Sequence, residues 1–307
     1  MKNLVAGGAG FLGSHIIDKL MCSGEKVICL DNLFSGNLKN VKKWENNPNF
    51  IFMEHDILNP IDLDVDRIWH FSCPASPSLY QIDPINTLNV CFKGTSNLLD
   101  LARNNNAKLL LASSSEIYGQ AEQYPTDEAY NGSVNPFSIR SCYSEGKRIS
   151  ESLCFAYFKK YNVDISIARI FNVYGPRMDP NDGRVISNFI GNVMREKTIM
   201  INGDGKQTRS FCYVDDIVEG LFKLMKSSYK YPINFGNPDE EYTIIEIANL
   251  IIKILKFNVG IEFSSPIIDE PVRRKPNIFL ANRNLKWYPK YSIFYGLNKT
   301  IDKFKLI

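Results

Sequence analysis

The sequence predicts an α/β protein built on a Rossmann-type, doubly wound parallel sheet, with a smaller C-terminal substrate domain. Two observations support this fold class. Short apolar runs alternate with helical patterns through the first half of the chain, and a glycine-rich turn joins the first run to the first helix. Strands that alternate with helices pair in parallel, and ligands bind such sheets beyond the carboxyl ends of the strands.

The expected strands are short runs rich in apolar residues. They cover residues 4–6, 26–30, 50–53, 67–71, 107–112, 163–170 and 231–235. Helices are expected over 11–23 and 84–103, and a third helix should carry Tyr143 and Lys147. The alternation breaks after residue 177, where turn residues gather.

This break divides the chain into two expected domains. Residues 1–175, with a returning strand near 231–236, form the first domain. Residues 176–307 form most of a second, interleaved domain that lies over the sheet.

An apolar stripe runs along the expected helix over 84–103. Its members are Ile85, Leu88, Phe92, Thr95, Leu99 and Ala102, at alternating spacings of three and four. Such a stripe usually faces the core of its own chain. It also fits a seam against a helix of a partner, and the pattern alone leaves both interpretations open.

The charge distribution argues against nucleic acid as a partner. The formal net charge is +3, and no stripe rich in lysine and arginine is present. A small anionic molecule fits better. The chain opens directly with an apolar strand instead of a signal peptide, and no apolar run approaches the roughly 18 residues that span a bilayer. We therefore expect a cytoplasmic protein with no membrane partner.

The cysteines and histidines disfavour several kinds of site. The 7 cysteines are odd in number and include no Cys-x-x-Cys pair, so we expect reduced, mostly buried thiols. The 3 histidines lie at 15, 55 and 70, and none has metal-ligand spacing, so no metal site is expected. A Ser-His-Asp hydrolase is disfavoured because no Gly-x-Ser-x-Gly elbow is present.

The segment Gly7-Gly-Ala-Gly10-Phe-Leu-Gly13 predicts a dinucleotide site. The first glycine permits a tight turn, the second lets the backbone approach a pyrophosphate, and the third lets the helix pack on the strand. Amides at the helix N-terminus suit the phosphates. Asp31 follows the second strand, where its carboxylate suits a ribose diol and repels a 2′-phosphate, and Asn32 follows instead of an arginine. NAD is therefore favoured over NADP.

Further cofactor contacts are expected around this turn. Asp56 follows the third strand and either meets the adenine or is an ordinary loop carboxylate. The full predicted cofactor set is Gly7, Gly10, Phe11, Leu12, Gly13, Asp31, Asn32, Asp56, Ile57, Tyr143 and Lys147.

A catalytic group is predicted between residues 110 and 147. Tyr143 and Lys147 share one helix face, so the ammonium favours the phenolate and lets the tyrosine accept an alcohol proton near neutral pH. Ser114 can hold the same substrate oxygen. Glu116 adds a carboxylate that simple alcohol oxidation does not need. Because such a Tyr/Lys pair also occurs on solvated helix faces, the assignment depends on the other motifs in the chain.

Together these motifs resemble the extended short-chain dehydrogenase/reductase family, and within it the UDP-glucuronate decarboxylases. The matching stretches are 70–77, 111–119, 134–136, 140–148, 168–172, 174–178, 181–185 and 207–209. The resemblance covers essentially the whole chain. Residues 74–77 and 142–148 are more specific to the decarboxylases than the glycine turn is.

The resemblance implies an NAD-dependent decarboxylation of UDP-glucuronate that gives UDP-xylose. Tyr143 would take the 4-hydroxyl proton while Lys147 holds the nicotinamide ribose and Ser114 holds the oxygen. The resulting 4-ketone is β to the C6 carboxylate, so loss of carbon dioxide leaves an enolate. Glu116 would manage the proton traffic, and return of the hydride to C4 recycles the cofactor.

The resemblance also assigns substrate contacts. Arg274, within 270–276, is expected to grip the sugar carboxylate in bidentate fashion, although a solvated basic turn would have a similar sequence. Tyr80 is a second candidate near the carboxylate. The full predicted substrate set is Pro77, Tyr80, Glu116, Arg140, Asn172, Arg184, Val185, Arg209 and Arg274, and the catalytic set is Ser114, Glu116, Tyr143, Lys147 and Arg274.

The chain departs from the decarboxylase pattern at two positions. Ser114 stands where many members have threonine, which preserves the hydroxyl. Cys91 stands where they commonly have asparagine. Members pair through a four-helix bundle whose helices begin near Pro84 and Tyr143, so the resemblance implies a homodimer.

Other functions remain open from the sequence. A related decarboxylase would release the 4-keto pentose together with NADH. A UDP-sugar 4-epimerase or a 4,6-dehydratase would share Tyr143 and Lys147, but a dehydratase should carry an acidic pair at 115–116, and Ser115 breaks that pair. A non-catalytic nucleotide-sensing or scaffold protein would keep the fold without needing these side chains.

Overall fold

Seven parallel strands form one central sheet in the computed structural model, which describes residues 1–267 and 269–305. In chain order they are β1 (Lys2–Ala6), β2 (Lys26–Asp31), β3 (Phe50–Glu54), β4 (Arg67–His70), β5 (Lys108–Ser114), β6 (Ile165–Ile170) and β11 (Pro232–Phe235). Their order in space is β11-β6-β5-β4-β1-β2-β3. The order reverses between β1 and β4, where ligand crevices open in doubly wound sheets. The predicted fold class is confirmed.

Strand β5 extends beyond the apolar run that predicted it. Its register continues to Ser114, which is paired with Ile170 of β6. The ladder therefore reaches into the serine cluster, because backbone pairing does not require apolar side chains. Ser114 consequently lies on a rigid strand end instead of a loop.

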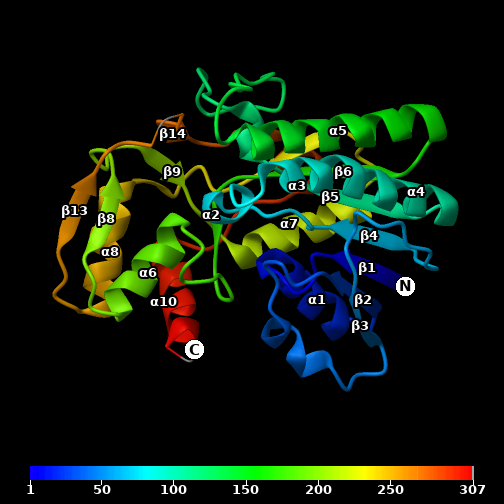
Figure 1. The fold of residues 1–307 in the computed structure, drawn as a ribbon, viewed down its shortest axis with the longest axis horizontal. Coiled ribbons are helices and arrows are strands. Elements are labelled where there is room, and N and C mark those ends of the chain that lie inside the picture. The colour runs from blue at the N-terminus through cyan, green and yellow to red at the C-terminus, as the bar shows by residue number, and fades with distance from the viewer. Residues whose placement is uncertain (268, 306–307) are drawn as a thin grey trace.

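Helices cover both faces of this sheet (Figure 1). The helices α4 (Thr95–Asn105) and α5 (Ser141–Tyr161) lie on one face, and α1 (Phe11–Cys22) and α7 (Val214–Lys226) lie on the other. Helix α7 packs against α1 and β6. Segments from both halves of the chain thus build the same layer.

The helix predicted over 84–103 is interrupted. Helix α3 (Pro84–Asn89) leads into a π-helical turn, η3 (Val90–Gly94), before α4 begins. The wider turn changes which side chains share a face. On its outer side Ile85, Leu88 and Phe92 are 74%, 40% and 49% exposed, whereas Thr95, Leu99 and Ala102 are buried. The stripe is therefore part core and part exposed surface.

The other elements form a smaller lobe beside the carboxyl ends of the strands (Figure 1). Its helices are α6 (Val185–Met194), α8 (Ile244–Leu255) and α10 (Ile293–Phe304). Its strands are β7 (Val173–Tyr174) with β10 (Cys212–Tyr213), β8 (Ile199–Asn202) with β13 (Ile261–Ser264), and β9 (Thr208–Ser210) between β12 (Glu241–Thr243) and β14 (Arg273–Arg274). One apolar core joins this lobe to the sheet. Among the described residues, no helix has both the length and the apolar character needed to cross a membrane.

Short elements complete the chain. They are the helices α2 (Pro77–Tyr80) and α9 (Phe279–Leu285) and the single turns η1 (Leu38–Asn40), η2 (Lys42–Trp44) and η4 (Ser115–Tyr118). Of these, α2 and η4 stand at the carboxyl edge of the sheet, because they come soon after β4 and β5 in the chain. In the small lobe, Arg274 of β14 is the register partner of Arg209 of β9, so one short ladder brings both arginines to the same edge.

Candidate active site

A cavity of about 940 Å³ lies between the carboxyl ends of the strands and the small lobe. Every residue predicted to bind cofactor or substrate lines it, with the exception of Tyr80. Segments separated by more than 250 residues, such as Gly10 and Arg274, therefore face one space. Within the described part of the chain, no group of three or more metal-ligating side chains is placed to hold an ion.

The glycine turn forms one end of the cavity. Gly7 has φ +76°, and its amide donates to the Leu30 carbonyl at 2.8 Å. A Cβ atom at Gly13 would lie 2.2 Å from the Gly7 carbonyl oxygen, so only glycine fits there. Gly10 caps α1 without a side chain, which leaves the first amides of the helix open to a phosphate.

Acidic and amide side chains follow the next two strands. The carboxylate of Asp31 accepts hydrogen bonds from the amides of Ala9 and Leu33, both at 2.9 Å. Burial raises the pKa of Asp31, and these two amides oppose that rise. Asn32 donates to Asp56 at 2.9 Å. The second and third strand ends are thus joined by a polar pair at the cavity wall.

Helix α5 presents Tyr143 and Lys147, the predicted catalytic pair, beside the end of β5. The Lys147 ammonium donates to the Ala112 carbonyl at 2.9 Å and lies 5.8 Å from the centre of the Tyr143 ring. Burial raises the pKa of Tyr143 to about 12, although Lys147 and Ser114 both act to lower it. Desolvation therefore opposes the phenolate, and the Lys147 ammonium is the main group that favours it.

Buried arginines surround Glu116. Its Oε1 is 2.6 Å from Nη2 of Arg140, and its Oε2 is 2.9 Å from Nη2 of Arg274. Burial disfavours the carboxylate, but Arg274 and Arg140 hold the pKa of Glu116 below its usual range. Glu116 is consequently ionised at neutral pH and can accept a proton.

One nitrogen of the Arg274 guanidinium has no hydrogen-bond partner among the described residues. Its Nη1 donates to the Ser115 hydroxyl at 3.0 Å, and the side chain is 6% exposed. Its Nη2 makes no hydrogen bond of good geometry to the described residues, despite the nearby Glu116. A buried donor without a hydrogen bond is costly unless a ligand completes it.

The remaining predicted substrate residues lie at the small lobe. Arg209 pairs with Glu270 at 3.0 Å, and burial together with Arg274 lowers the pKa of Arg209 to about 10. Arg184 donates to Asp182 at 2.7 Å. Pro77, Asn172 and Val185 also line the cavity.

Comparison with known proteins identifies the family. Residues 3–235 match the NAD dependent epimerase/dehydratase family. UDP-glucuronic acid decarboxylase 6 of Arabidopsis thaliana is 46% identical over 307 residues, which are 100% of this chain and 89% of that protein. UDP-glucuronic acid decarboxylase 1 of Xenopus tropicalis is 47% identical over 302 residues, which are 98% of this chain and 72% of that protein. The chain belongs to the UDP-glucuronic acid decarboxylases of this NAD-dependent family.

A solved structure agrees with this assignment. The UDP-glucuronic acid 4-epimerase from Bacillus cereus, crystallised with UDP-glucuronic acid and NAD, matches with a TM-score of 0.89 at 29% identity. The match covers 100% of this chain and 99% of that chain. The resemblance found in the motifs is thus confirmed at the level of family and fold.

One expected decarboxylase contact, Tyr80, occupies a different place. Its side chain is 1% exposed and stacks on Tyr143, with ring centres 5.0 Å apart and planes at 6°. Its hydroxyl is buried and has no hydrogen-bond partner among the described residues. Tyr80 therefore supports the ring of Tyr143 and does not line the cavity, because helix α2 turns it inward.

Some residues of the site were not predicted as such. Ser115 holds Arg274, Glu270 holds Arg209, and Cys73 lines the cavity next to the catalytic helix. Ser115 and Glu270 lie within segments that the motifs already marked. Their charge and hydrogen-bonding capacity were visible in the sequence, but their partners are distant in the chain.

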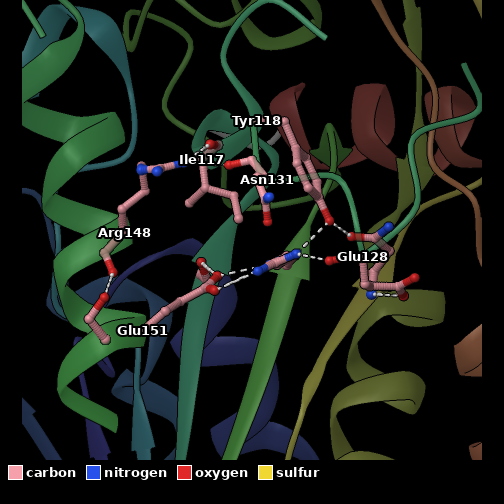
Figure 2. Close-up of polar contacts among 10 residues, drawn as sticks. Ile117, Tyr118, Glu128, Asn131, Arg148 and Glu151 are labelled. Atoms are coloured by element: carbon pink, nitrogen blue, oxygen red, sulfur yellow. Dashed lines mark hydrogen bonds and ion pairs between the residues drawn. The ribbon is translucent and has the colours of Figure 1, made fainter. Parts of the chain in front are cut away.

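An ion pair behind the cavity fixes the catalytic helix (Figure 2). Arg169 of β6 donates to Glu151 of α5 at 2.8 Å, and the Ser113 hydroxyl donates to the same carboxylate at 2.5 Å. Arg169 also donates to the Tyr118 hydroxyl at 2.9 Å. The side chains of Glu151 and Arg169 are each 11% exposed. This network joins α5 to β5 and β6 directly beneath the catalytic residues.

Removal of Glu151 should destabilise the protein. Glu151→Ala leaves a buried guanidinium without its counter-charge, so we expect a loss of about 3–5 kcal/mol in the free energy of unfolding. Glu145→Ala, on the same helix, removes a pair with Arg148 whose side chains are 39% and 38% exposed. That control should change stability by less than about 1 kcal/mol. Chemical denaturation followed by circular dichroism measures both, and equal effects would contradict the structural role of Glu151.

Proposed function

We propose that this protein decarboxylates UDP-glucuronate to UDP-xylose, using NAD as a recycled hydride carrier. The observation that carries the proposal is the arginine cluster next to the Tyr143/Lys147 pair. Among the residues that the structure describes, Arg140, Arg209 and Arg274 pair with two carboxylates there, those of Glu116 and Glu270. Three guanidinium groups and two carboxylates leave one positive charge in a buried space, which a substrate carboxylate would neutralise.

The residues of the first lobe fit NAD. The glycine turn leaves the N-terminus of α1 uncovered, and the Asp31 carboxylate retains acceptor capacity for a ribose diol. Its negative charge disfavours a 2′-phosphate. NAD supplies the hydride acceptor and donor when it is bound, and the protein supplies position and field.

Ser114 and Tyr143 would have different roles at the 4-hydroxyl group of the sugar. Ser114 would hold the 4-oxygen of the sugar while Tyr143 removes its proton. Burial raises the pKa of Tyr143 to about 12 even though Lys147 and Ser114 oppose that rise. A second positive charge beside Lys147 would favour the phenolate further, and oxidised nicotinamide is cationic. Proton removal is thereby coupled to occupancy of the cofactor site.

The arginine cluster would act on the carboxylate. The Nη2 group of Arg274, which has no hydrogen-bond partner among the described residues, can donate to an oxygen of the sugar carboxylate. This hydrogen bond would hold the C6 carboxylate in position while the β-ketone forms. Loss of carbon dioxide then carries the electron pair into an enolate. Glu116 is ionised, so it would take up and pass on a proton, through water, toward C5.

Proton NMR of UDP-glucuronate incubated with the protein and NAD tests the proposed reaction. UDP-xylose formed without net NADH absorbance is the expected result. A 4-keto pentose formed with stoichiometric NADH would show instead that the protein is an oxidative decarboxylase. Inversion at C4 with the carboxylate retained, or reaction of UDP-glucose instead, would show that it is an epimerase or dehydratase.

Tyr143→Phe separates an enzyme from a nucleotide-binding protein. The variant keeps the stacked ring but loses the proton acceptor, so kcat should fall by roughly 10²–10⁴-fold while UDP-glucuronate still binds. Turnover by NMR and binding by calorimetry measure the two effects. Unchanged turnover would remove Tyr143 from the mechanism.

Arg274→Ala tests recognition of the carboxylate against a neighbouring control. Loss of a buried charged donor should cost about 2–5 kcal/mol, or at least about 30-fold in kcat/KM for UDP-glucuronate. Binding of UDP-glucose, which has no carboxylate, should change much less. Arg273→Ala removes a pair with Glu241 in which the arginine side chain is 42% exposed and the glutamate side chain 15%, and it should leave both values nearly unchanged. Equal loss for both sugars would assign Arg274 to the nucleotide instead.

We also propose a homodimer that forms through the exposed part of the helical stripe. Ile85, Leu88 and Phe92 lie outward on α3 and η3, next to α5, which adds Ile149 and Phe155 at 40% and 50% exposure. A continuous apolar face of this kind fits a second copy of the same face.

Phe92→Asp should therefore halve the mass measured by light scattering. Phe263→Asp, at a 53% exposed site on β13 of the small lobe, is the control and should not change it.

The thiols are consistent with a cytoplasmic location, which we propose as well. All seven cysteines are free, and five of them are buried. Such usage is typical of proteins from reducing compartments.

A further inference from the structure

Two thiols meet beside the catalytic lysine. The Sγ atoms of Cys73 and Cys91 are 3.2 Å apart and share a hydrogen bond. Cys73 belongs to the loop that follows β4, and Cys91 belongs to the π-helical turn η3. The contact therefore links a loop at the cavity wall to a helix of the layer above the sheet.

Cys91 is held firmly against the catalytic helix. A Cβ atom at Gly146 would lie 2.9 Å from its sulfur, so glycine is what allows the sulfur to approach α5. The Ser150 hydroxyl donates to the Cys91 carbonyl at 2.8 Å. These two contacts lie on either side of Lys147 in the sequence of α5.

Cys73 is the accessible partner of the pair. It lines the cavity and is partly exposed, whereas Cys91 is 2% exposed. It packs against Tyr143 in a small cluster. The hydrogen bond with Cys91 and the ammonium of Lys147 lower the pKa of the Cys73 thiol, against the effect of burial. A small oxidant that enters the cavity would therefore meet Cys73 first, and the thiolate is its reactive form.

We propose that Cys73 and Cys91 form a reversible disulfide that inactivates the enzyme. Hydrogen peroxide oxidises the Cys73 thiolate: a sulfur–oxygen bond forms, the oxygen–oxygen bond breaks, and the hydroxide that leaves takes up the proton lost by the thiol and becomes water. The sulfur of Cys91 then attacks the sulfenic acid, and the second water leaves as the disulfide forms. Two thiols and one peroxide thus give one disulfide and two waters. A dithiol reductant reverses the step by thiol–disulfide exchange.

The loss of activity follows from geometry. A disulfide requires a sulfur separation near 2.05 Å, so the pair must close by roughly 1 Å from the 3.2 Å contact. Because Cys91 is fixed to α5, the cavity loop that carries Cys73 has to move. Displacements of about 1 Å near reacting groups cost up to roughly 10²-fold in rate. We expect kcat/KM to fall by about 10- to 100-fold on oxidation and to recover on reduction.

The test compares oxidised and reduced protein in wild type and three variants. Wild type, Cys91→Asn and Cys22→Ala are treated with hydrogen peroxide, alkylated and digested, and the peptides with Cys73 and Cys91 are sought as a linked pair by mass spectrometry. Turnover of each form is measured before oxidation, after it, and after dithiothreitol. Cys22 is exposed, so Cys22→Ala controls for surface oxidation. Cys91→Ala is a second variant in case the asparagine disturbs packing.

The expected result is a 73–91 linkage in wild type and Cys22→Ala, with a reversible loss of activity relative to the reduced form of the same protein. Cys91→Asn and Cys91→Ala should show neither. Two outcomes would overturn the proposal: oxidation of Cys22 without the linkage, or a linkage that leaves turnover unchanged. The linkage is read by mass, so failure of the proposed decarboxylation would remain distinguishable from failure of the disulfide.

Discussion

The active site depends on the attachment of helix α5 to strand β5. Two residues of α5 that lie one helical turn apart make this attachment. Lys147 donates to the Ala112 carbonyl, and Glu151 accepts hydrogen bonds from Ser113 and from Arg169 of the neighbouring strand β6. Each of these bonds joins a residue of the helix to the end of the strand or to its neighbour. Because Ser114 follows directly on the same strand, the separation between its hydroxyl, which we propose holds the substrate, and Tyr143 is set by these bonds and not by loops.

The charged groups of the site are arranged in two separate layers. Behind the cavity, Glu151 and Arg169 form an ion pair that supports the fold, and Glu151 also raises the pKa of Lys147. Above them, Glu116 is shared between Arg140 and Arg274. Buried charges are tolerated when they are paired, so the unpaired positive charge in the upper layer is a cost to the protein. In the proposed function, the carboxylate of the substrate would offset that cost by pairing with the excess positive charge.

The sequence was most informative where local patterns decide the structure. The central strands, the glycine turn and the position of Asp31 follow from periodicity and from the backbone needs of glycine, and these features were predicted correctly. The π-helical turn was missed because a helix with one wider turn keeps nearly the same apolar spacing. Tyr80 was misplaced because its orientation depends on how α2 meets α5, which no local pattern records. Likewise, the pairing of Arg209 with Glu270 joins residues 61 positions apart.

Lys147 is the point at which these features meet. Burial opposes its charge, but Cys73, Tyr143, Cys91 and Glu151 all raise the pKa of the ammonium. A buried cation with several acidic neighbours responds to the protonation of each of them, because the interactions are strong where the dielectric is low. The phenol of Tyr143 and the thiol of Cys73 therefore compete for the same positive charge. Conversion of that thiol to a disulfide removes one of these two acidic groups near Lys147. It also moves the loop that carries Cys73. Oxidation of the sulfur pair would therefore change both the charge around Tyr143 and the position of its neighbours.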